Sequence, residues 1–224
     1  MKVEAIWLEE AQGFIRVTSM ENNTPLIYHI NTRASKQYSG FRQILKDLKI
    51  VKEIIQTLKQ NASNGLSSIV KQSLSFYAIV TYAKCFTEAN GRGPKLNKVD
   101  ALKYATKQSG VEHDRIMEQR HNYVAHGGLK GYEHNLVVAA LESDLSNKKV
   151  IEIYDNIVGL VDIDSQLDNF EYLVNSVVQY VIEKCETSLN KITTEIGEQN
   201  IEELYKLAID PNNYGKVVIN AIKK

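Results

Sequence analysis

The side chains best suited to chemistry lie in seven consecutive residues, from Arg120 to His126. An arginine keeps its charge at any ordinary pH, and its paired N–H groups can hold a phosphodiester through two hydrogen bonds. A histidine titrates near neutral pH, so His126 could take the proton of a ribose 2′-hydroxyl. An arginine and a histidine beside one groove would therefore suit phosphate-ester chemistry.

Both side chains also have purely structural interpretations. Helical periodicity places Arg120 on one face with Ile116 and Val124, within an apolar stripe. A buried arginine needs an acid, a set of carbonyl groups or a ligand anion, and an ion pair with Glu118 or with a residue from another helix is one interpretation. A histidine at a helix end is often only a cap, although the helix dipole there favours the charged form of His126.

The geometry of an ideal helix separates the two side chains. Six residues correspond to about 600° of turn, which leaves roughly 120° between the directions of Arg120 and His126. They converge only if the helix end unwinds at Gly127 or a second subunit completes the site. Asn122 lies four residues before His126, so those two side chains can meet on one face.

The elements that must position these residues are predicted by the apolar pattern and its interruptions. Apolar residues at three- and four-residue steps predict helices, and Val- and Ile-rich runs around a polar turn predict a β-hairpin. The pattern predicts helices over about 41–58, 66–86, 97–109 with Gly110 as its stop, 111–126, 163–196 and 201–208, and a hairpin over about 134–156. The fold class that follows is mainly α, an antiparallel helical bundle with a small hairpin inserted before the last long helix.

A chain of 224 residues suits one domain with appendages. Residues 1–35 fit an N-terminal arm or short strands, and residues 36–210 form the predicted helical domain. Residues 211–224 form a C-terminal tail without an assigned element. No apolar run is long enough to span a membrane and no secretory signal is visible, so we expect a cytoplasmic protein without membrane contact.

The balance of positive and negative charges argues against non-specific binding to nucleic acid by the whole chain. The 27 basic and 27 acidic residues cancel, so no global basic excess drives binding to phosphates. Binding would need a local patch, for which Arg92–Lys107 is one candidate and a solvated helix face is the simpler interpretation.

Cysteine usage and ligand spacing give no metal centre. Cys85 and Cys185 each fall within an apolar helical stripe, which favours buried reduced thiols, although spacing alone leaves a disulfide open. His113, Asp114 and Glu118 lack the spacing of a metal site. We therefore expect neither a metal nor a cofactor.

The motif Arg120–His126, with the sequence RHNYVAH, resembles the Arg-polar-x4–6-His signature of HEPN domains. It is most similar to the subgroup whose motif reads roughly Arg-Asn/Asp-Lys-x-x-Ala-His, found near abortive-infection and toxin–antitoxin genes. The context is also similar, with a preceding helix that contains Tyr82 and Phe86, a glycine-containing loop, and His113 upstream of the motif. The resemblance covers roughly residues 40–195.

This resemblance implies an all-α bundle that is often a homodimer, with the motif of each subunit facing a shared cleft. Active members are metal-independent ribonucleases that leave 2′,3′-cyclic phosphate ends. On this basis Arg120 positions the scissile phosphate, and His126 acts as general base or acid. His121 or Asn122 orients the substrate, with His113 as a further substrate-binding candidate, although the family more often has Asn or Asp where this chain has His121.

The implied partners are RNA as substrate and an antitoxin-like protein. Many members of the family are non-catalytic, and the motif does not separate them from ribonucleases. The alternative function is therefore a helical module that binds a partner protein or a nucleotide in the same cleft without catalysis.

Overall fold

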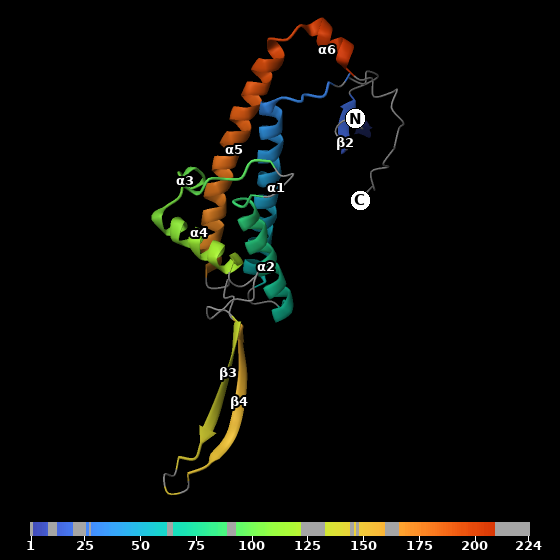
Figure 1. Cartoon of the computed structure of the whole chain (residues 1–224). Coiled ribbons are helices and arrows are strands. Elements are labelled where there is room, and N and C mark those ends of the chain that lie inside the picture. The colour runs from blue at the N-terminus through green and yellow to red at the C-terminus, as the bar shows by residue number, and fades with distance from the viewer. Residues whose placement is uncertain are drawn as a thin grey trace. The chain divides into compact units, whose positions relative to one another are not determined.

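The computed structural model describes residues 2–8, 13–19, 26, 28–61, 65–88, 93–121, 133–143, 146, 148–159 and 166–208. This part of the chain is mainly α-helical, with two pairs of antiparallel strands, as Figure 1 shows. The helices are α1 (Arg33–Gln60), α2 (Ser68–Lys84), α3 (Lys98–Ala101), α4 (Lys107–Gln119), α5 (Leu167–Gly197) and α6 (Ile201–Leu207). None of the described helices has the length and apolar character needed to cross a lipid bilayer.

The chain divides into two compact units. The larger unit, residues 37–187, contains the candidate site. Its core forms because the apolar stripes of α1, α2, α4 and α5 pack against one another, which removes their surface from contact with water. The fully buried large side chains of this core are Tyr82, Phe170, Leu48, Ile55, Leu58, Ile79, Ile116, Leu173, Val51 and Val174.

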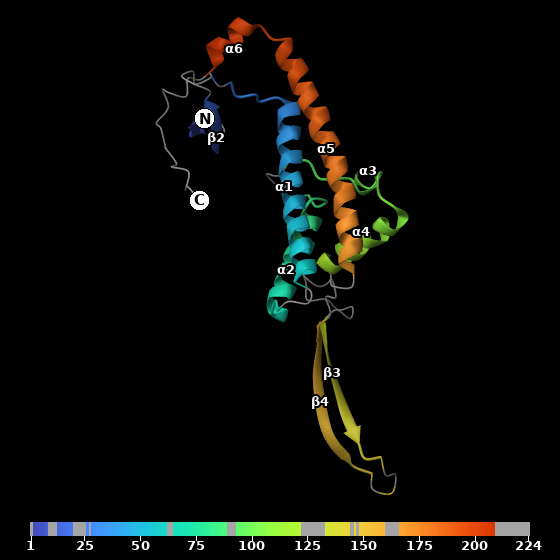
Figure 2. The same cartoon turned by 180° about the vertical axis from the view of Figure 1, so that it is seen from behind.

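Helices α1 and α5 lie side by side and antiparallel in both views (Figures 1 and 2). Lys59, near the end of α1, pairs with Asp168 at 2.5 Å and Glu171 at 2.7 Å, near the beginning of α5. These partly exposed ion pairs add little stability, so the buried apolar side chains hold the two helices together. The prediction of a mainly α antiparallel bundle is confirmed.

A glycine in the middle of α1 allows a loop to lie directly against the helix. A Cβ atom added to Gly40 would collide with the Pro94 side chain and would lie 3.2 Å from the Cα atom of Gly93. Glycine lowers helix stability in general, by about 1 kcal/mol relative to alanine. Close packing of residues 93–94 therefore explains why α1 carries one here.

The third and fourth helices begin and end elsewhere than the sequence pattern predicts. Helix α3 spans only Lys98–Ala101, and α4 begins at Lys107 and continues through Gly110. The prediction that Gly110 ends a helix is wrong because the Thr106 side chain caps α4, accepting a hydrogen bond from the Ser109 backbone N–H at 3.3 Å. The cap starts the helix before the glycine, which then adopts ordinary helical geometry.

The predicted hairpin before the last long helix is confirmed. Strands β3 (Glu133–Leu141) and β4 (Val150–Gly159) pair antiparallel, with an irregularity in register between Ala140 and Leu141. In the N-terminal region, where the sequence fits an arm or strands, β1 (Lys2–Leu8) and β2 (Gly13–Ser19) also pair antiparallel. The predicted tail, residues 211–224, lies outside the described residues.

Both cysteines are free thiols in the helical core. Cys85 and Cys185 are each buried, and neither forms a disulfide. Burial raises the pKa of the Cys185 thiol, and the nearby positive charge of Arg42 partly opposes that effect. The thiols therefore belong to the packing of the core, as their place in apolar stripes predicts.

Candidate functional site

Helix α4 and the two residues after it contain three of the five residues that the sequence singles out. His113 lies within the helix, and Arg120 and His121 follow directly after its last residue, Gln119. The backbone of Arg120 keeps α-helical geometry, with φ −57° and ψ −44°. Asn122 and His126 lie outside the described residues, so their predicted roles stay predictions.

Arg120 is half-buried at this helix end. Its backbone N–H continues the helical hydrogen bonding by donating to the carbonyl oxygens of Ile116 and Met117. Within the described part of the chain, no acid forms an ion pair with its guanidinium, and an ion pair with Glu118 is not formed. The guanidinium donors therefore differ from those of a structural arginine, which are taken up by a carboxylate.

The structural ion pair of α4 lies one and a half turns earlier, between Arg115 and Glu112. Arg115 Nε donates to Glu112 Oε2 at 2.9 Å, and Nη2 donates to Oε1 at 2.5 Å. The Glu112 side chain is only 2% exposed. Sequence reasoning missed this pair, although opposite charges three residues apart on a helix are a recognisable signal.

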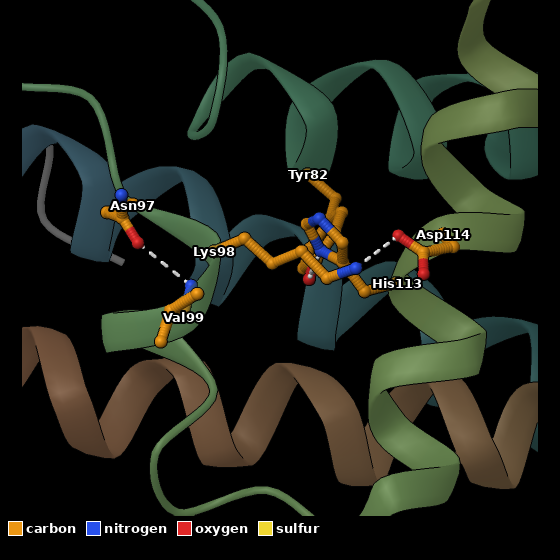
Figure 3. A network of polar contacts seen from close by, with 6 residues as sticks. All are labelled: Tyr82, Asn97, Lys98, Val99, His113 and Asp114. Atoms are coloured by element: carbon orange, nitrogen blue, oxygen red, sulfur yellow. Dashed lines mark hydrogen bonds and ion pairs between the residues drawn. The ribbon is translucent and has the colours of Figure 1, made fainter.

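His113 lies in the interior of the helical unit, where it contacts α2. Its Nδ1 atom is 2.9 Å from the hydroxyl of Tyr82, and its ring meets the Phe86 ring edge-on, with centroids 4.6 Å apart. Figure 3 shows this pair beside the surface ion pair of Lys98 and Asp114, whose Nζ and Oδ1 atoms are 2.6 Å apart. The described contacts of His113 are thus internal, and its contact with a substrate stays a prediction.

The interior location also sets the charge of the imidazole. Burial, together with the positive charge of Lys98, lowers the pKa of His113 from 6.5 to about 4, against a smaller raising effect of Asp114. Burial likewise raises the pKa of the Tyr82 hydroxyl well above its ordinary value. At neutral pH the ring is therefore uncharged, and the Tyr82 hydroxyl keeps a proton that it can donate to Nδ1.

This lowered pKa predicts a pH-dependent stability. Between about pH 6.5 and about pH 4 the unfolded chain binds a proton at His113 that the folded chain excludes, so the free energy of unfolding falls as the pH falls. We expect the free energy of unfolding to fall by about 2 kcal/mol across this range of pH, after allowance for partial screening by solvent. Urea unfolding at several pH values measures it.

A matched pair of variants isolates the contribution of His113. His113→Gln should remove this part of the pH dependence, whereas His121→Gln, a change at an exposed position just past the end of the same helix, should keep it. The difference between the two curves cancels the titration of the carboxylates. Identical curves for both variants would assign the effect to another group.

Gln119 is a residue of the helix end that sequence reasoning did not single out. It is 4% exposed, and its Oε1 atom has no hydrogen-bond partner among the described residues. Buried polar atoms without a partner are uncommon in folded proteins. Its neighbour in the chain is Arg120, so one helix end holds both a half-buried guanidinium and a buried amide.

No three histidine, cysteine, aspartate or glutamate side chains gather as metal ligands within the described residues. The described side chains at the end of α4 supply a guanidinium, an imidazole and an amide. Known protein-family models, curated proteins and solved structures were compared with the chain, and none of them matches.

Proposed function

We propose that this chain is a HEPN-like, RNA-associated protein of the cytoplasm, which acts as a metal-independent endoribonuclease in a defence or toxin–antitoxin system. The observation that carries the proposal is the half-buried Arg120 at the end of α4, whose guanidinium no described acid neutralises. It begins the motif that closes with His126. The mainly helical fold agrees with this assignment without identifying the family.

The proposed reaction is an internal transesterification of RNA. Arg120 holds the two non-bridging oxygens of the scissile phosphate and stabilises the negative charge that develops on them. His126 accepts the proton of the 2′-hydroxyl, the O2′–P bond forms, and the P–O5′ bond breaks. The 5′-oxygen takes up a proton from solvent as it leaves, the other product carries a 2′,3′-cyclic phosphate, and His126 afterwards returns its proton to solvent.

A homodimer is part of the proposal, because six residues separate the arginine from the histidine. On one ideal helix their side chains would point roughly 120° apart. A second subunit that supplies the facing histidine would complete the site, and an antitoxin-like partner would cover it.

The test is a cleavage assay with several RNAs in the presence of EDTA, comparing wild type with His126→Ala. We expect the wild type to cut RNA and leave cyclic phosphate ends, and the variant to lose at least about a hundredfold in rate. Circular dichroism and size-exclusion chromatography of both proteins check that fold and oligomeric state are retained.

The remaining outcomes of this assay are informative in opposite ways. Absence of cleavage by the wild type across all RNAs would refute the ribonuclease activity and favour the alternative function, a non-catalytic binding module. Equal cleavage by wild type and variant would mean that His126 takes no part in the reaction.

A further inference from the structure

The zero net charge of the chain conceals an uneven distribution. Helix α1 carries seven basic residues and only two acidic ones, Asp47 and Glu53. Asp47 already pairs with Lys84 of α2, with Oδ2 and Nζ 3.1 Å apart. The helix is therefore a positively charged element on a neutral protein, and the acidic excess lies elsewhere in the chain.

Three cations of α1 form a row on one side of the helix. Arg42, Lys46 and Lys49 are separated by four and three residues, which places their side chains on the same face. All three are exposed, and none forms an ion pair with a described acid. We call these three residues the basic stripe; its members follow one another by about 6 and 4.5 Å along the helix axis.

The surroundings of the basic stripe decide what kind of partner it fits. The large apolar residues that the described part of the chain exposes all lie outside α1, whose own apolar side chains face the core. A helix that binds a membrane surface needs an apolar face to insert among the lipids, and α1 has none left over. Glu53, one turn after Lys49, limits the stripe at its C-terminal side.

We propose that the basic stripe binds the phosphate backbone of single-stranded RNA. The proposal rests on the proposed function, since it names the surface by which the same RNA is held. A row of cations without acid partners gains affinity for a polyanion by releasing its condensed counterions, whatever the base sequence. Such a surface supplies the affinity that the zero net charge of the whole chain does not.

The test measures binding of a fluorescein-labelled single-stranded RNA by anisotropy at several salt concentrations. The background is His126→Ala in EDTA, so that no RNA is cut. The stripe variant is Arg42→Gln/Lys46→Gln/Lys49→Gln. The control variant, Lys148→Gln/Lys191→Gln/Lys206→Gln, removes the same number of charges from exposed positions scattered outside α1.

We expect the stripe variant to bind about tenfold more weakly at low salt, and the control variant to bind within about twofold of the background. The slope of log affinity against log salt should fall by about 2 in magnitude for the stripe variant alone, since each neutralised phosphate of a single strand contributes about 0.7. Equal affinities and slopes for the two variants would overturn the proposal. So would binding to phosphatidylserine vesicles with no binding to RNA.

Failure of this proposal can be told apart from failure of the proposed function. Wild-type cleavage with EDTA, together with equal RNA binding by the two triple variants, would refute RNA binding by the basic stripe and support the ribonuclease activity. RNA binding that depends on the basic stripe, together with no wild-type cleavage, would support RNA binding by the basic stripe and refute the ribonuclease activity.

Discussion

Replacing Phe170 with alanine should lower the free energy of unfolding by about 3–5 kcal/mol. The Phe170 side chain is fully buried on α5 and meets the Tyr82 ring of α2 edge-on, with centroids 5.5 Å apart. Truncation would remove its buried apolar surface and leave a cavity where several helices pack together. Urea unfolding followed by far-UV circular dichroism measures the loss.

The matched control lies two residues along the same helix. Tyr172 is a comparably large aromatic residue that is 50% exposed, so Tyr172→Ala should cost about 1 kcal/mol or less. A typical domain has only about 5–15 kcal/mol of stability, so the Phe170 variant would lose a large share of it. Similar losses at the two positions would mean that α5 does not contribute its Phe170 face to the core.

The long helices could be predicted from the sequence because their signal is local. The steps of three and four residues between Ile44, Leu48, Val51 and Ile55 specify both a helix and the side of it that is buried. The same periodicity predicts α5. The boundary between α3 and α4 was predicted wrongly because a glycine inside a helix and a glycine after one look alike in sequence.

Contacts between elements far apart in the chain could not be predicted. Gly40 is explained only by Pro94, which lies more than fifty residues later. The burial of His113 is explained by the earlier residues Tyr82, with which it shares a buried hydrogen bond, and Phe86, which its ring contacts. Apolar periodicity specifies that a face is buried, but it does not specify which polar side chain is buried opposite it.

The candidate site could be predicted in part. An arginine within an apolar stripe was expected to be buried and to need a partner, and Arg120 is half-buried at the end of α4. The partner proposed on sequence grounds, Glu118, forms no described ion pair with it, and the buried ion pair within this helix joins Arg115 to Glu112. Arg115 and Arg120 thus differ in whether a described carboxylate pairs with the guanidinium. This property distinguishes a structural arginine from one that is available to a ligand.

That difference predicts losses of stability of unequal size for two similar substitutions. Arg115→Ala should lower the free energy of unfolding by about 3 kcal/mol, because it leaves the carboxylate of Glu112 buried without its counter-charge. Arg120→Ala removes no ion pair that the described residues form, and should cost about 1 kcal/mol or less. Urea unfolding at neutral pH measures both losses.

A double-mutant cycle with Glu112→Gln and Arg115→Met then separates the ion pair from the packing of each side chain. The double variant should be more stable than the sum of the single losses predicts, by about 2–3 kcal/mol, because neither partner is left buried and charged. A large loss for Arg120→Ala in the same experiments would make Arg120 a structural residue and remove the observation that carries the proposed function. A small loss of stability, accompanied by loss of RNA cleavage, would support the place of Arg120 in the site, since its guanidinium would then be needed for the reaction and not for the fold.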